Sequence, residues 1–379
     1  MAEGGNMEAV AAVTAAEETK QKEAEDRRRK VERVALPAGM VLVQAFTVVT
    51  MVLSKVALNA GMHPLVLLVY RNLFAAVAVL PLAVAFERDL WKKLNLAALG
   101  WITINATLGV LLAMGLYYCG LRATSAAYAV DFLNLIPVAT FLIAAVLRVE
   151  RLSLASWPSR AKLLGAAAGV AGIMVVSLCK GPRLLRPSSH SHGAGSAALV
   201  HGDMVLGTLF LAGSCVSYAL WFVVQARVAV VFPSRYWSTT LTCLIGSVQS
   251  AIAAAVVVAL TGPGQGLALA AWRLRWDMQL ATVIYSGVFN TGATFVLVSW
   301  TVARRGPVYP SMFNSLSLVA TTVVDAVVLG TDVYLGGVLG AALVVAGLYA
   351  FLWGKGKELA AAKEMERRRG DVVDGCNIA

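Results

Sequence analysis

Leu164–Gly181, LGAAAGVAGIMVVSLCKG, is the stretch that decides the fold, because the chain contains it twice. The second copy is Leu339–Gly356, LGAALVVAGLYAFLWGKG, at a shift of 175 residues, and nine of eighteen positions are identical. The shared residues include two pairs of glycines: Gly165 with Gly340, and Gly172 with Gly347. Each copy closes a series of similar apolar segments. The pattern therefore indicates two halves of one design.

The composition indicates a membrane protein. Hydrophobic residues make up 59% of the chain and charged residues 14%, whereas soluble domains average about 45–50% and about 25%. The net charge of +11 would suit a nucleic-acid binder. However, the Lys and Arg residues lie between apolar segments instead of forming one basic stripe. We therefore attribute the charge to membrane topology and expect no nucleic-acid partner.

Ten apolar segments follow a charged N-terminal tail, and each is long enough to cross about 30 Å of hydrocarbon as a helix. The first half contains the segments 36–58, 64–86, 97–119, 125–147 and 161–179. The second half contains the segments 204–226, 237–260, 278–301, 307–330 and 335–353. An odd number of spans per half gives the two halves opposite orientations. The predicted fold is an all-α membrane protein with ten transmembrane helices in two inverted five-helix repeats.

The distribution of positive charge predicts the topology. With both termini in the cytosol, 24 of the 32 Lys and Arg residues fall in cytosolic tails and loops, and six fall on the opposite side. This asymmetry agrees with the positive-inside rule. The predicted organisation is a cytosolic charged tail (1–35), a first repeat (36–181), a non-cytosolic linker loop (182–203), a second repeat (204–356) and a cytosolic charged tail (357–379).

Ionisable residues inside the apolar segments are candidate site residues, because a charge in lipid is costly unless it finds a partner. Arg71 lies about seven residues, or roughly 10 Å, into the segment 64–86. Asp131 lies at a similar depth in the segment 125–147, so the two residues could form a structural ion pair. Alternatively, Arg71 offers its guanidinium to a substrate carboxylate. Asp131 would then hold Arg71 or accept an ammonium group.

Amide side chains form the second group of candidates. Asn134 lies about nine residues into its segment from outside, and Asn314 about eight residues into its segment from inside. Both therefore approach the bilayer midplane at positions related by the inverted repeat. Gln225 and Asn290 are further candidates. Such amides either form hydrogen bonds between helices or bind a polar solute, and the sequence leaves both interpretations open.

The sequence has no pattern of enzyme or cofactor chemistry. The four His residues lie in or beside loops, and the motifs HExxH, GxSxG and GxxxxGKS do not occur. We therefore expect no enzymatic activity, no metal and no cofactor. The spacings Gly165–Gly169 and Gly336–Gly340 favour close helix packing, with a homodimer face as the alternative. A membrane scaffold without transport is a further alternative, but a scaffold needs no polar midplane.

Seven segments resemble one family in order and spacing. They are SKVALNAGMHPLVLLVYRN (54–72), GLYYCGLRATSAAYA (115–129), LNLIPVATF (133–141), LTCLIGSVQS (241–250), WDMQLATVIYSGV (276–288), RRGPVYPSMFN (304–314) and YLGGVLGAALVVAGLYAFLWGK (334–355). They resemble the plant Walls-Are-Thin-related or nodulin-like proteins, also called usually-multiple-acids-move-in-and-out transporters. This family belongs to the EamA branch of the drug/metabolite transporter superfamily. The resemblance implies ten helices, with the pathway lined by helices 1–4 and 6–9.

The resemblance also implies an activity, namely passive and often bidirectional movement of amino acids across the plasma membrane. Some members of the family move auxin or act at the vacuole. By position, Arg71, Asn134 and Asn314 match typical family residues. Asp131 and Asp325 depart from the family, which has small or apolar residues there. We expect a plasma-membrane transporter of amino acids or similar small organic acids that contacts membrane lipid. Auxin or a related aromatic acid is the alternative substrate.

Overall fold

The computed structural model describes residues 27, 31–32, 34–51, 53–54, 56–58, 60–124, 132–133, 135–147, 156–178, 183–185, 201–261, 272–274, 277–314, 316 and 333–376. The chain divides into two compact units, Met1–Leu42 and Val43–Ala379. The described part of the first unit is helical. All of the candidate site residues belong to the second unit.

Seven helices among the described residues are long and apolar enough to cross a membrane. They are Val34–Leu58, Pro64–Phe86, Leu96–Leu121, Met204–Val231, Arg235–Ala259, Met278–Arg305 and Leu335–Glu358. Each of them coincides with one of the ten predicted segments. The segments 125–147 and 307–330 are described only in part. The count of ten helices and the orientation of the termini therefore stay predictions.

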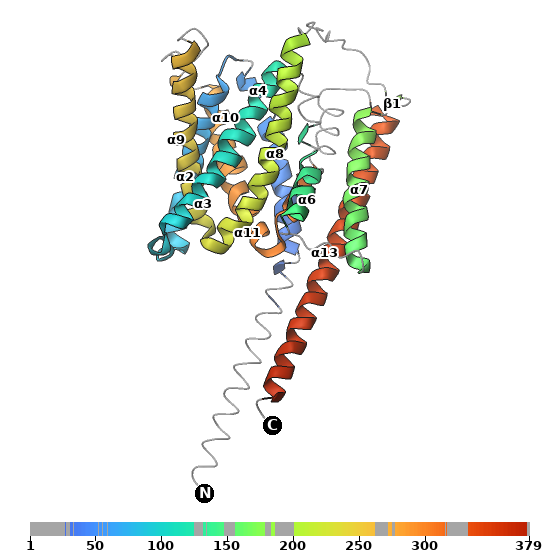
Figure 1. Ribbon diagram of the computed structural model, residues 1–379. Helices are drawn as coiled ribbons and strands as arrows, with labels where there is room; N and C mark the ends of the chain where they lie inside the picture. Colours follow the sequence, from blue (N-terminus) through green and yellow to red (C-terminus); the bar gives the residue numbers. More distant parts are fainter. Residues whose placement is uncertain are drawn as a thin grey trace. The chain divides into compact units, whose positions relative to one another are not determined.

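The helices of the first half are α2 (Pro64–Phe86), α3 (Leu96–Ala106), α4 (Gly115–Ala123), α6 (Ile136–Val146) and α7 (Trp157–Leu178), with a short 3₁₀ turn, η1 (Leu90–Lys93). The helices of the second half are α8 (His201–Val231), α9 (Arg235–Thr261), α10 (Met278–Tyr285), α11 (Thr294–Arg305) and α13 (Leu335–Cys376). Figure 1 shows these helices running alongside one another as a bundle. Apart from one small sheet, the described residues with regular structure are helical.

A π-helical segment of eight residues interrupts the third membrane-length helix of each half. In the first half, η2 (Thr107–Met114) joins α3 to α4. In the second half, η4 (Ser286–Ala293) joins α10 to α11. A π-helix widens the helical turn, and such segments occur frequently at functional sites. Nothing in the hydrophobic pattern predicted them.

Local capping groups explain where several helices begin and end. His63 precedes α2, and its Nδ1 accepts a hydrogen bond from the backbone N–H of Leu65 at 3.3 Å. Pro64 then occupies the first helical position, where its missing N–H has no cost. Asn95 caps α3 in the same way, accepting from the backbone N–H of Ala98 at 2.7 Å. At these two helix starts, the predicted boundaries of 64 and 97 agree closely with the observed ones.

Helices α7 and α13 pack closely through the glycines of the repeated stretch (Figure 1). A Cβ atom added to Gly165 would lie 2.6 Å from the carbonyl oxygen of Gly347, and one added to Gly172 would lie 2.8 Å from that of Gly340. Residues 165 and 340, and residues 172 and 347, are equivalent positions of the two copies of the repeat. The Gly165–Gly347 contact of one copy therefore corresponds to the Gly340–Gly172 contact of the other. An approximate twofold axis between α7 and α13 produces this correspondence. Close packing, one of the two interpretations of these glycines, is therefore confirmed.

Helix α13 continues beyond the Lys-Gly pair that closes the second copy of the repeat, and it ends at Cys376. The residues after Gly356 include many strong helix formers, Ala, Glu, Lys, Met and Arg, so isolated glycines do not stop the helix. At the other end of α13, the strand β2 (Val333–Tyr334) pairs antiparallel with β1 (Arg183–Leu185). The all-helical prediction did not include this two-stranded sheet.

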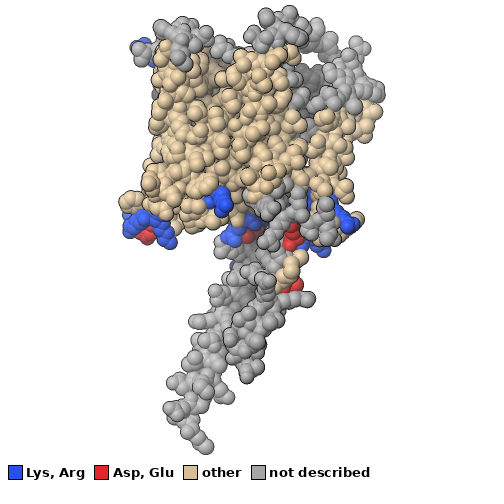
Figure 2. Space-filling model, in the orientation of Figure 1, with Lys and Arg blue, Asp and Glu red and all other residues tan. Residues whose placement is uncertain are grey.

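Charged side chains are unevenly distributed over the face of the molecule shown in Figure 2. The described Lys, Arg, Asp and Glu residues on this face lie mainly at one end of the helices. They border a broad band of uncharged residues that covers the helices themselves. This arrangement suits helices whose sides face lipid and whose ends face the polar headgroups.

Candidate functional site

Arg71 is a charged residue buried inside the helix bundle. It lies in α2, about 10 Å along the helix from Pro64, and only 2% of it is exposed. The backbone of α2 approaches η4 closely there, because a Cβ atom added to Gly287 would lie 2.7 Å from the carbonyl oxygen of Arg71. Arg71 is therefore held beside the π-helical segment of the second half.

Three neutral side chains accept hydrogen bonds from the guanidinium of Arg71. Its Nε donates to the hydroxyl of Thr291 at 2.7 Å. Its Nη1 donates to the hydroxyl of Tyr118 at 3.3 Å, and its Nη2 to the sulfur of Met114 at 2.6 Å. Thr291 lies in η4, and Met114 is the last residue of η2. Arg71 thus bridges the π-helical segments of the two halves.

The charge of Arg71 is not balanced by any carboxylate of the described residues, whose ion pairs involve other groups. The predicted partner, Asp131, lies outside the described residues, so the Arg71–Asp131 ion pair stays a prediction. A guanidinium remains protonated in proteins. A buried charge that is surrounded by neutral acceptors alone is costly. A negative charge beside Arg71, from Asp131 or from a ligand, would offset this cost.

We name Tyr118, Tyr218, Trp221 and Phe295 the aromatic wall; of these residues, Tyr118 accepts a hydrogen bond from Arg71. The ring centroids of Tyr218 and Trp221 are 6.1 Å apart, and those of Trp221 and Phe295 are 5.1 Å apart. Trp221 is 3% exposed and packs directly over Gly109 of η2, where a Cβ atom would overlap its ring. These aromatic residues pack inside the bundle and do not form an interface belt.

Two amides of the second half receive hydrogen bonds from the first helix of the first half. The hydroxyl of Thr47 donates to Oδ1 of Asn290 at 3.1 Å, and Nε2 of Gln44 donates to Oδ1 of Asn314 at 3.4 Å. Asn290 directly precedes Thr291, which accepts from Arg71. These contacts form a polar path between the halves, which consists of Arg71, Thr291, Asn290, Thr47, Gln44 and Asn314.

Two hydroxyls extend the polar face of the first helix beyond Thr47. Thr50 and Ser54 are buried, at 3% and 4% exposure. Neither hydroxyl has a hydrogen-bond partner among the described residues. Buried polar groups normally find a partner. A hydroxyl can both donate a hydrogen bond to a water molecule or a polar solute and accept one from it.

The polar path contains three of the predicted site residues: Arg71, Asn290 and Asn314. Gln225 lies in α8, one turn beyond Trp221, and is 5% exposed. Among the described residues, no hydrogen bond joins it to the path. Asn134 lies outside the described residues, as does Asp325. The predicted midplane pair of Asn134 and Asn314 is therefore untested.

Sequence reasoning missed Gln44 and Thr47. The signal was available, because Gln44, Thr47, Thr50 and Ser54 recur every three or four positions on one face of a mainly apolar segment.

A bundle of apolar, membrane-length helices with a buried polar path between two related halves defines a multi-pass membrane transport protein. The model of the EamA-like transporter family matches the chain twice, over residues 38–178 and 205–353. The chain belongs to this family and, within it, to the WAT1-related proteins. Because this is a family of transporters, membership favours transport over enzymatic chemistry.

Two curated relatives from Arabidopsis thaliana illustrate the similarity. WAT1-related protein At4g08290 is 33% identical over 324 residues, which cover 84% of this chain and 82% of that protein. Protein WALLS ARE THIN 1 is 33% identical over 347 residues, which cover 88% of this chain and 87% of that protein. A solved crystal structure matches with a TM-score of 0.58 at 17% identity, over 83% of this chain and 96% of that chain. The last similarity concerns the fold alone.

Proposed function

We propose that this protein moves amino acids or similar small organic acids across a membrane by alternating access, as a bidirectional facilitator or an exporter. The observation that carries the proposal is Arg71, a buried guanidinium with three neutral hydrogen-bond acceptors. A carboxylate fits a guanidinium fork in charge and in geometry. The acceptors of Arg71 lie in both halves, so movement of the halves would change the environment of a bound carboxylate.

The remaining candidates have roles that follow from their chemistry. Asn290 and Asn314 bind the amino group or the side chain of the solute through their amides. Asp131 accepts the ammonium group of an amino acid or holds Arg71 in place. Asn134 and Gln225 complete the set of substrate-binding amides.

An aromatic acid such as the auxin indole-3-acetate is the second candidate substrate. The aromatic wall favours it, because Tyr118 of this wall accepts a hydrogen bond from the guanidinium that would hold the carboxylate. Ring stacking of this kind contributes about 0.5–1.5 kcal/mol beyond the burial of the ring. This substrate does not need an acceptor for an ammonium group.

The same proposal places both termini in the cytosol and the protein in the plasma membrane. The excess of Lys and Arg in the tails and in alternate loops supports this orientation. The two repeats, 36–181 and 204–356, would then rock against each other around the polar path. A homodimer is compatible with this mechanism but is not required by it.

Efflux from frog oocytes tests the proposal. Oocytes that express the protein are injected with a labelled amino-acid mixture or with labelled indole-3-acetate. We compare Arg71→Ala with Arg88→Ala, which removes an exposed arginine outside the membrane-length helices. Loss of a hydrogen-bonded buried charge is worth about 1.5–3 kcal/mol, so we expect at least tenfold slower efflux for Arg71→Ala.

Surface abundance of each variant is measured in the same oocytes. Normal efflux in Arg71→Ala at normal abundance would contradict the role of Arg71. Release of indole-3-acetate alone would favour the second substrate class. If the wild-type protein is abundant at the surface but releases neither solute, both proposed substrate classes are excluded.

A further inference from the structure

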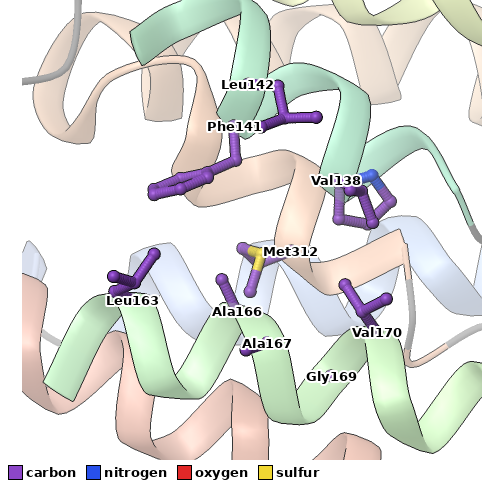
Figure 3. A pocket seen from close by; sticks show the side chains of 10 residues that line it. Val138, Phe141, Leu142, Leu163, Ala166, Ala167, Gly169, Val170 and Met312 are labelled. Carbon is purple, nitrogen blue, oxygen red and sulfur yellow. The ribbon is translucent and has the colours of Figure 1, made fainter. Parts of the chain in front are cut away.

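An apolar pocket lies between α6 and α7, and no residue of the polar path lines it (Figure 3). Its volume is about 170 Å³. The lining residues are all apolar: Pro137, Val138, Phe141, Leu142, Leu163, Ala166, Ala167, Gly169, Val170 and Met312. Figure 3 shows the side chain of Met312 between the two helices. No polar side chain lines this pocket, so it does not suit an amino acid.

The pocket has an exposed mouth and a buried floor. Leu142 and Leu163 are 57% and 36% exposed, and they lie at the mouth on opposite helices. Phe141 and Met312 are 7% and 4% exposed, and they form the floor. The pocket therefore opens on the side of the helix bundle, where α6 and α7 face the surroundings of the protein.

The charged residues of α7 precede the pocket. Trp157 and Arg160 are exposed, and Lys162 pairs with Glu358 at 2.8 Å, so the polar end of α7 extends to residue 162. Leu163 follows directly, and Val170 lies about 10 Å further along the helix. The exposed residues of α7 between them are apolar, which suits a helix face in contact with acyl chains.

We propose that the pocket between α6 and α7 binds the acyl chain of a membrane phospholipid. An empty apolar void forfeits the dispersion contacts of the atoms that line it. Water does not compensate, because the pocket offers no polar side chain to hold it. An apolar cavity of about 150 Å³ accommodates a molecule the size of benzene, so this pocket accepts a short section of an acyl chain. Acyl chains are the abundant apolar groups at this depth.

The bound chain would contact the helix segment that carries part of the polar path. Met312 lies two residues before Asn314, whose Oδ1 accepts from Gln44. An acyl chain on the floor of the pocket thus packs against the segment that positions Asn314. This inference concerns lipid binding and does not depend on the identity of the transported solute.

A photoreactive lipid tests the inference. The purified full-length protein is placed in nanodiscs that contain phosphatidylcholine with a diazirine in its acyl chain. After illumination, labelled peptides are quantified by mass spectrometry. We expect at least fivefold more labelling at Phe141 and Met312 than at Val248 and Ile252, which are exposed residues of α9 that do not line the pocket.

Substitutions that fill the pocket should abolish the preferential labelling of Phe141 and Met312. A Cβ atom at Gly169 meets no atom within 4 Å, so Gly169→Leu extends into the free space, and Ala167→Phe is a second filling variant. Leu164→Phe is the matched control, since Leu164 is exposed on α7 but does not line the pocket. We expect at least fivefold less labelling in a filling variant and no change in the control. Uniform labelling of exposed helix faces, or unchanged labelling in monodisperse filling variants, would overturn the proposal.

Discussion

Glu87 should stabilise the contact between the two halves at one end of the bundle. It follows the last residue of α2, and its carboxylate accepts hydrogen bonds from the first residues of α9. The backbone N–H groups of Arg235 and Tyr236 donate to it at 3.2 and 3.1 Å, and the hydroxyl of Ser234 donates as well. A carboxylate at this position also interacts favourably with the positive end of the α9 dipole.

The magnitude follows from what Glu87→Ala removes. Hydrogen bonds to charged groups contribute about 1.5–3 kcal/mol when well buried. Glu87 is only half-buried, and Ser234 would still cap α9 by accepting from the backbone N–H of Trp237 at 3.1 Å. We therefore assign about 1 kcal/mol to each of the two backbone hydrogen bonds and about 0.5 kcal/mol to the dipole. The free energy of unfolding should fall by about 2–3 kcal/mol in Glu87→Ala.

The free energy of unfolding can be measured by titrating the protein in mixed micelles with sodium dodecyl sulfate and following tryptophan fluorescence. Asp89→Asn is the matched control. Asp89 lies two residues further along and pairs with Lys92 at 3.0 Å, but its side chain is 86% exposed. Such a surface pair contributes about 0–1 kcal/mol. If Glu87→Ala and Asp89→Asn lower the free energy of unfolding equally, the reasoning about the Glu87 contact is wrong.

The remaining predictions concern glycines at close contacts. Gly165→Ala should lower the free energy of unfolding by about 1–3 kcal/mol, because its Cβ atom would lie 2.5 Å from the backbone nitrogen of Phe351. Gly100→Ala is the control and should not destabilise α3, because a Cβ atom there meets no atom within 4 Å. Equal effects of the two substitutions in the same titration would contradict this prediction. Gly109→Ala should cost a similar amount through its overlap with Trp221. Combining it with Trp221→Phe should give a double-mutant coupling above about 0.5 kcal/mol, and strict additivity would show that the overlap is relieved elsewhere.

The periodic features of the sequence were sufficient to predict the seven membrane-length helices among the described residues. A repeat of 175 residues and long apolar segments depend on composition and spacing, which are visible without any structure. Arg71 was recognisable for a similar reason, since a charge within an apolar segment is costly and thus informative. What the sequence could not supply was its set of partners. Thr291, Tyr118 and Met114 come from three separate elements, and only the packing of those elements brings them to one guanidinium.

The π-helical segments could not be predicted from the hydrophobic pattern. η2 and η4 consist mainly of small and apolar residues that an α-helix also accepts. The widened turns coincide with close contacts between elements, at Gly109 beneath Trp221 and at Gly287 against the backbone of Arg71. The change from α-helix to π-helix thus occurs where separate elements pack against each other. The local sequence alone does not show which elements pack there.

Hydrogen bonds between the two halves are important for stability because the helices are surrounded by apolar lipid. Apolar side chains gain little by leaving acyl chains for one another, so polar contacts and close packing hold membrane helices together. Two such contacts lie at different levels of α2. Glu87 binds the start of α9, and, about 25 Å away along the helix, the hydroxyl of Tyr70 donates to the carbonyl oxygen of Trp272 at 2.6 Å. Under the proposed alternating access, the Glu87 contact at the end of α2 forms in one of the two states and breaks in the other. Weakening the Glu87 contact should therefore shift the population of the two states as well as the stability, because it raises the free energy of only the state that contains it.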